Sequence, residues 1–166
     1  MNRDTEILLR NVAGRLERAV TERDCPAMVA VQGDRTLVLS DYDYLRDAPT
    51  AAAFEQRAAE KARQIHAVRF VFAVPQVWLF DQDTVYGRAV ANLPLREGEQ
   101  ELIAWMSFDA DDGVDYGYLP YARRPSGEPV FDDHTVITVP VQPYDDFPGR
   151  HLLRALTHES GDPTST

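Results

Sequence analysis

Two short acidic clusters contain the residues whose types and spacing first suggest chemistry. Asp109, Asp111 and Asp112 precede Gly113, and several carboxylate oxygens on a turning backbone are ligands that Ca²⁺ prefers. An EF-hand loop has its glycine at the sixth position and a bidentate glutamate at the twelfth, whereas here Gly113 is fifth and Pro120 is twelfth. Asp and Gly are typical of tight turns, so the segment predicts a hairpin turn without a metal.

The second cluster is Asp132-Asp133-His134, with His151 and His158 further along the chain. Two carboxylates beside an imidazole suit a mononuclear metal site or a general base. The chain has no His-x-His or His-Glu-x-x-His spacing that would place such ligands together. We therefore predict a polar loop that enters the last strand.

The candidate nucleophiles lack the sequence context that activates them. Ser40, Ser107, Ser126 and Cys25 lie outside any Gly-x-Ser-x-Gly elbow, and Cys25 is the only cysteine. A lone cysteine is more often a small core hydrophobe than a reactive thiolate. A carboxylate pair of the glycosidase type, such as Glu101 with Asp115, stays open because its separation depends on the fold. Without a nucleotide-binding glycine pattern either, we predict no catalytic residue and no cofactor.

Charge is distributed unevenly along the chain. The stretch 81–146 has fourteen acidic and four basic residues, which equals the net charge of −10 of the whole chain, and it is rich in aromatic residues. Such a surface repels phosphate backbones and attracts basic partners. We therefore expect a non-enzymatic accessory protein that presents an acidic, aromatic surface to a protein partner, and no direct nucleic-acid binding. The expected surface consists of Asp109, Asp111, Asp112, Asp115, Tyr116, Tyr118, Tyr121, Asp132 and Asp133.

Three alternatives stay open at this point. Self-association, as a homodimer, through an edge of the sheet is one. The second is an enzyme or small-ligand protein with a pocket between a curved sheet and a helix, for which His66, Tyr116 and His134 are the first candidates. The third is a DNA mimic, in which regularly spaced carboxylates replace phosphates and block a nucleic-acid-binding protein.

Length and hydropathy predict one compact domain. The 166 residues suit a single domain, which we place at 1–159 with a disordered tail at 160–166. The sequence has no apolar run near the roughly 20 residues that span a bilayer and no secretory signal pattern, so we expect a cytoplasmic protein that does not bind membranes. Sixteen of the seventeen basic residues are Arg, which suggests a GC-rich bacterial or archaeal genome.

Hydrophobic periodicity predicts an α+β fold, with an antiparallel sheet of five or six strands, a β-hairpin plus a meander, packed against two main helices. Apolar residues at three- and four-residue steps predict a helix at 4–23, which Asp4 is expected to cap. Trp78 and Trp105 are expected in the core. Further helices are expected at 50–66 and 148–157, and strands at 28–31, 36–39, 68–80 with a bend at Pro75, 102–108, 114–121 and 135–139.

The segment around the long strand resembles a group of uncharacterised bacterial and phage proteins. The resemblance covers 54–131 and depends on Val68-Arg69-Phe70-Val71-Phe72 followed by Gln76-Val77-Trp78, and on Pro94-Leu95-Arg96-Glu97 before Glu99–Glu101. The group tends to have Glu-Ala-Trp where this chain has Gln76-Val77-Trp78. The resemblance implies a helix followed by a meander, and it implies no activity.

Overall fold

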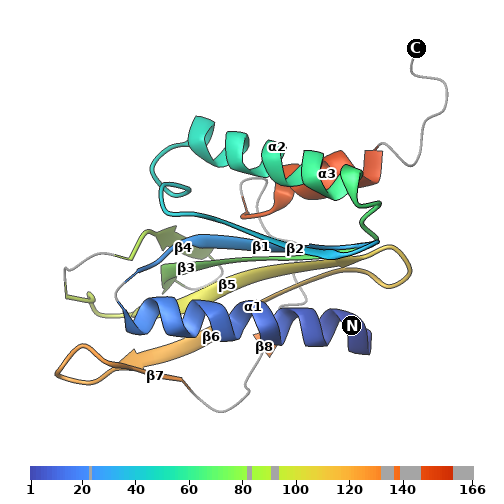
Figure 1. The fold of residues 1–166 in the computed structure, drawn as a ribbon. Helices are drawn as coiled ribbons and strands as arrows, with labels where there is room; N and C mark the ends of the chain where they lie inside the picture. Colours follow the sequence, from blue (N-terminus) through green and yellow to red (C-terminus); the bar gives the residue numbers. More distant parts are fainter. Residues whose placement is uncertain (23, 82–83, 91–93, 132–136, 139–146, 159–166) are drawn as a thin grey trace.

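The computed structural model shows an antiparallel sheet with helices on both faces (Figure 1). It describes residues 1–22, 24–81, 84–90, 94–131, 137–138 and 147–158. The helices are α1 (Arg3–Thr21), α2 (Ala48–Gln64) and α3 (Arg150–His158). The strands are β1 (Ala27–Gln32), β2 (Thr36–Asp41), β3 (Arg69–Asp81), β4 (Thr84–Arg88), β5 (Glu99–Asp109), β6 (Gly113–Arg123), β7 (Pro129–Phe131) and β8 (Ile137–Thr138).

The sheet is built around β3 and β5. Its strands follow the order β2-β1-β3-β5-β6-β7, with β4 beside β3 and β8 beside β6, and every pair is antiparallel. β3 and β5 pair over eleven positions, from Arg69 opposite Asp109 to Leu79 opposite Glu99. Leu102 to Ser107 are all buried, because both faces of β5 are covered. The predicted α+β class with an antiparallel sheet is confirmed.

The side chains of alternating strand residues pack into two separate cores, one on each face of the sheet. On one face, α1 packs Leu8, Val12 and Leu16 against Trp105 and neighbouring side chains. On the other face, α2 and α3 cover the sheet, as Figure 1 shows. This second core contains Phe54, Phe70, Phe72, Trp78, Leu102, Met106 and Leu152. The sheet is therefore the middle layer of three, and both tryptophans are buried as predicted.

The core beneath α1 also contains polar atoms without partners. Trp105 Nε1 and Ser107 Oγ are buried and have no hydrogen-bond partner among the described residues. Both side chains belong to β5 and point to the α1 face, since they share the parity of Ile103.

Pro75 marks the place where β3 changes neighbours. Residues up to Ala73 pair with β1, and residues from Val77 pair with β4, so 74–76 have no strand on that side. A proline is tolerated there because it has no N–H to donate. The expected strand at 68–80 is one continuous strand in the structure, but β4 was not predicted.

Several local predictions need correction. Asn2, not Asp4, caps α1, because its Oδ1 accepts a hydrogen bond from the Thr5 N–H at 2.9 Å. β7 was not predicted, and of the strand expected at 135–139 only Ile137–Thr138 lie among the described residues, as β8. The tail expected at 160–166 lies outside them. In the part of the chain that the structure describes, every helix is too short or too polar to cross a membrane.

Candidate functional site

Asp109 is a structural residue of the β5–β6 turn and not part of an exposed surface. Its side chain is buried, its Oδ1 accepts the N–H groups of Asp111 and Asp112, and its Oδ2 lies 3.0 Å from Nε of Arg69. Burial pushes its pKa upward, but hydrogen bonds from Asn2, from these N–H groups and from Arg69 outweigh burial and hold the pKa at about 2. Asp111 and Asp112 are exposed in the hairpin turn that the sequence predicts.

The three tyrosines of the expected surface do not share a face. Tyr116 and Tyr118 lie on the α2–α3 side, where their rings contact Phe147 and Trp78 at centroid distances of 5.6 and 5.4 Å. Tyr121 lies on the α1 side and is buried. Because strand residues alternate, the even and odd positions of β6 separate these rings. The expected surface is therefore split between both faces of the sheet.

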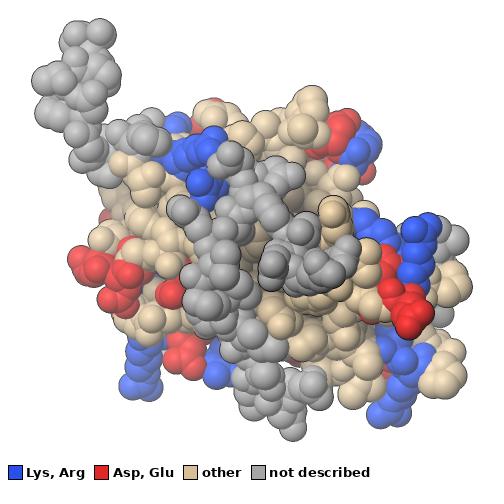
Figure 2. All heavy atoms as spheres, turned by 180° about the vertical axis from the view of Figure 1, so that it is seen from behind, with Lys and Arg blue, Asp and Glu red and all other residues tan. Residues whose placement is uncertain are grey.

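Arginines neutralise much of the acidic stretch. Glu99 accepts two hydrogen bonds from Arg88, and Glu101 accepts Nε of Arg123 at 2.9 Å. The Arg88 guanidinium and the Arg96 N–H hold the pKa of Glu99 at about 2. On the face shown in Figure 2, acidic and basic side chains lie next to one another in mixed groups.

The remaining members of the expected surface are Asp115, Asp132 and Asp133. Asp115 Oδ2 lies 3.6 Å from the amino group of Met1 on the α1 side. Asp132 and Asp133 lie outside the described residues, as does His134. Among the described residues, the acidic excess of 81–146 thus does not form one separate negative face, and none of these contacts favours a DNA mimic.

The alternative pocket is not assembled by the described residues. His66 is exposed, and its Nδ1 lies 2.7 Å from Oδ2 of Asp34 in the β1–β2 turn. The Asp34 N–H also donates to the Ile65 carbonyl oxygen, so this contact fastens the hairpin to the end of α2. Tyr116 instead packs against Phe147 in the core. His66 and Tyr116 therefore have separate structural roles.

Glu101 and Asp115 are too far apart for glycoside hydrolysis. Asp115 pairs with Ser107, which is six residues from Glu101 along β5. Six residues of a strand span about 20 Å, whereas the two carboxyl groups of a glycosidase lie roughly 5 to 10 Å apart. Glu101 is instead buried in its ion pair with Arg123.

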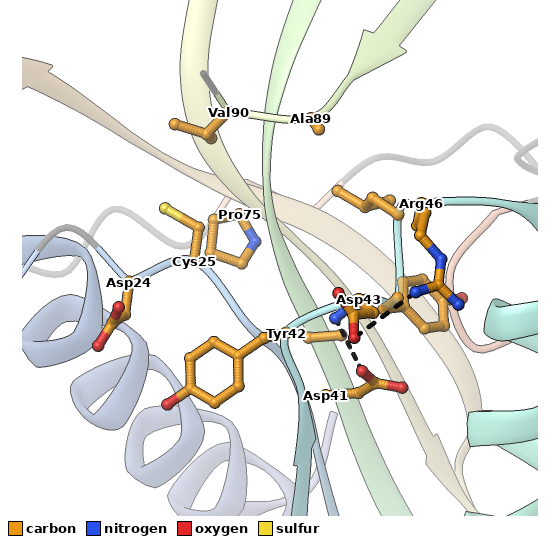
Figure 3. A pocket seen from close by; sticks show the side chains of 12 residues that line it. Asp24, Cys25, Asp41, Tyr42, Asp43, Arg46, Pro75, Ala89 and Val90 are labelled. Atoms are coloured by element: carbon orange, nitrogen blue, oxygen red, sulfur yellow. Dashed lines mark hydrogen bonds and ion pairs between the residues drawn. The ribbon is translucent and has the colours of Figure 1, made fainter. Parts of the chain in front are cut away.

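A cleft that the sequence did not predict lies beside Pro75, where β3 has neither β1 nor β4 as a neighbour. Its volume is about 410 Å³. Three segments meet there, as Figure 3 shows: the residues before β1, those after β2 and those after β4. The lining residues are Asp24, Cys25, Ala27, Asp41, Tyr42, Asp43, Tyr44, Leu45, Arg46, Pro75, Ala89 and Val90.

The cleft combines an apolar wall with an acidic rim. Three aspartates and Arg46 line it, and Oδ2 of Asp41 also lies 3.5 Å from Nη2 of Arg57. Tyr42 is 68% exposed beside them. The Asp43 N–H donates to Oδ1 of Asp41, and Arg46 Nη1 lies 3.9 Å from Oδ2 of Asp43. An apolar surface with carboxylates and an aromatic ring at its mouth suits a side chain that has an aliphatic stem and a cationic head.

Cys25 lines the cleft as a protonated thiol. It is half-buried, and burial raises the pKa of its thiol. The Arg123 charge opposes this rise, while the Glu101 and Asp24 charges add to it, and the net shift is upward. A raised thiol pKa opposes nucleophilic chemistry, in agreement with the small-hydrophobe interpretation. Within the described ranges, no group of three or more His, Cys, Asp or Glu side chains is arranged to hold a metal ion.

A sequence signal for this cleft was present in Asp41-Tyr42-Asp43-Tyr44, where carboxylates and aromatic rings alternate. The segment lies outside the acidic stretch 81–146, so the charge distribution along the chain does not point to it. Gln76, where the resembling group has an acidic residue, accepts the indole N–H of Trp78 at 2.7 Å. It therefore has a structural role.

No family model, curated protein or solved structure matches this chain at a significant level. The resemblance of the stretch 54–131 to a group of bacterial and phage proteins gains no support from these comparisons.

Proposed function

We propose that the protein is a non-enzymatic cytoplasmic accessory protein that binds a basic segment of a protein partner in the cleft beside Pro75. The observation that carries this proposal is the position of Asp24, Asp41 and Asp43 around an apolar wall, next to the exposed ring of Tyr42. This surface is also acidic and aromatic, but it lies at the end of β2 and shares no residue with the surface expected on β5–β7.

The contacts favour Lys or Arg over a neutral side chain. The aliphatic stem of either residue can lie on Pro75 and Val90, while its charge meets the aspartates at the rim. The face of an exposed tyrosine attracts a cation by about 0.5 to 1 kcal/mol. Single exposed ion pairs contribute little, so the proposal depends on several groups acting on one cation.

Photo-crosslinking from position 42 tests this proposal. A benzophenone amino acid in place of Tyr42 is expected to capture a protein through a Lys- or Arg-rich segment in a lysate of the source organism. Adding Asp24→Asn and Asp43→Asn is expected to reduce the capture several-fold, because two of the three rim carboxylates lose their charge. High salt is expected to reduce it as well, since exposed charges are screened.

The matched control is the same photoreactive residue at Tyr86, which is 57% exposed on β4 and does not line the cleft. Mass spectrometry of the crosslinked peptides identifies the contact. Capture of the same proteins from both positions, or capture that survives the two Asp→Asn changes, would contradict the proposal.

The second candidate function is binding of a small organic cation in the same cleft. A volume of about 410 Å³ lies within the range of small-molecule sites. A thermal-shift titration with a diamine and with an arginine ester distinguishes the two functions. Saturable stabilisation that Asp43→Asn abolishes, without any crosslinked protein, would favour the small ligand.

A further inference from the structure

β2 is an edge strand whose outer side is open. It is the first strand in the sheet order, and its backbone pairs with β1, residue for residue, without a bulge. Among the described residues, no other strand pairs with it. An edge of this kind presents a row of unpaired N–H and C=O groups that can accept another strand.

The two ends of the sheet differ in how they are protected. At the far end lie β7, which has three residues and begins with Pro129, and β8, which has two residues. Short strands and proline are common means by which proteins block edge pairing. The six residues of β2, Thr-Leu-Val-Leu-Ser-Asp, include no Pro, Gly or Lys. This edge therefore has none of those protections.

Geometry limits how a second copy of β2 can pair with the first. Successive residues of a strand point their backbone groups alternately to either side, and an antiparallel ladder joins outward groups to outward groups. Opposite residues in two antiparallel copies must therefore both be even-numbered or both be odd-numbered. The two-fold axis of such a pair then lies between the two strands, midway between one residue and the same residue of the second copy.

One of these registers is self-complementary. With Val38 on the axis, each Leu37 lies opposite Leu39 of the second copy, and each Arg35 lies opposite Asp41. Thr36 then lies opposite Ser40. The outermost pair thus combines opposite charges, and the next pair combines two hydroxyl groups. The leucine pair and the central valine pair are both apolar. Cross-strand pairs of these kinds stabilise the pairing of two antiparallel strands.

The neighbouring registers lack this match. An axis at Leu39 places Leu37 opposite Asp41 and Val38 opposite Ser40, so apolar side chains face polar ones. An axis at Leu37 places Arg35 opposite Leu39.

The environment of these side chains agrees with the Val38 register. Leu37, Val38 and Leu39 are only half-buried, so a second strand would cover the area they still expose. Arg35 is exposed in the turn before β2, at the opposite end of the strand from Asp41. Asp41 already pairs with Arg57 of α2 at 3.5 Å, so the apolar and hydroxyl pairs of the register carry the match.

From this pattern we infer that the protein forms a homodimer in which two β2 strands pair antiparallel about a two-fold axis that lies between the Val38 residues of the two copies. The two sheets then become one continuous sheet, and the contact is the same patch on both copies. The inference shares Asp41 with the proposed cleft, but its test does not, because Thr36 and Ser40 do not line the cleft.

Charge placed at positions 36 and 40 tests this register, since both residues are exposed and lie opposite each other only in the dimer. The wild-type protein is expected to sediment with twice the mass of one chain. A Thr36→Glu/Ser40→Glu variant and a Thr36→Lys/Ser40→Lys variant are each expected to dimerise about tenfold or more weakly, because like charges face each other twice. A mixture of the two variants is expected to form a heterodimer.

The control is the Thr36→Lys/Ser40→Glu variant, in which opposite charges face each other in the Val38 register. It has as many new charges as the other variants and is expected to dimerise at least as well as the wild type. Circular dichroism verifies that every variant is folded. A monomeric wild type at all concentrations, dimers that persist in both like-charge variants, or a mixture without heterodimer would each overturn the inference.

Discussion

Replacing Glu55 with Ala is expected to lower the free energy of unfolding by at least about 3 kcal/mol and to release α3 from the fold. Glu55 is a buried carboxylate of α2. Its Oε2 accepts the Tyr44 hydroxyl at 2.6 Å, and its Oε1 accepts the Leu152 N–H in the first turn of α3 at 3.1 Å. The first N–H groups of a helix have no partner within that helix, and a negative charge near them is favourable.

The change therefore removes two hydrogen bonds to a charged group and leaves a cavity. Chemical denaturation measures the loss of stability, and hydrogen exchange of α3 measures its release. Tyr44→Phe is the matched control, because it removes one of the two hydrogen bonds and is expected to cost about 1 kcal/mol. Unchanged amide protection of α3 in the Glu55→Ala variant would show that α3 is held by its apolar contacts alone.

Asp109→Asn is expected to destabilise the protein by about 2 kcal/mol at neutral pH, and by progressively less as the solution becomes acidic. The asparagine oxygen can still accept the N–H groups of the turn, but the charge that pairs with Arg69 is lost. The folded-state pKa of Asp109 is about 2, below its ordinary value of 3.8. Stability from the ionised form is therefore complete above the ordinary value and is lost as the pH falls through the folded value.

Urea denaturation of both proteins over this pH interval measures the effect. Glu99 also has a pKa of about 2, but it is present in both proteins, so the difference between them isolates Asp109. Asp111→Asn is the control, since Asp111 is exposed, and a change within about 0.5 kcal/mol is expected. A gap between wild type and Asp109→Asn that stays constant throughout the acidic range would refute the role of this ion pair.

The arrangement of elements was predictable because each depends on a local pattern. The apolar stripe of α1 and the double-sided apolar run of β5 both produced the elements that their periods indicate. Pro75 was placed correctly within one strand, because a proline there needs only an open edge. β4 was missed because its five residues have little hydrophobic alternation of their own.

The candidate site was predicted poorly for two different reasons. The separation of Tyr116 and Tyr118 from Tyr121 follows from strand alternation, and the parity of these numbers would have revealed it. The cleft is a different case, since it joins segments near Asp24, Tyr42, Pro75 and Val90 that only the sheet order brings together. Likewise, the arginines that neutralise Glu99 and Glu101 are eleven or more residues away in the chain.

The polar atoms buried beneath α1 affect where the structure opens locally. A buried polar group without a partner costs roughly 1 to 3 kcal/mol, and that cost disappears when water reaches the group. Trp105 Nε1 and Ser107 Oγ lie in this layer, whereas the carboxylate under α3 has its hydrogen bonds. We therefore expect transient local unfolding to admit solvent between α1 and the sheet before it reaches the layer under α3.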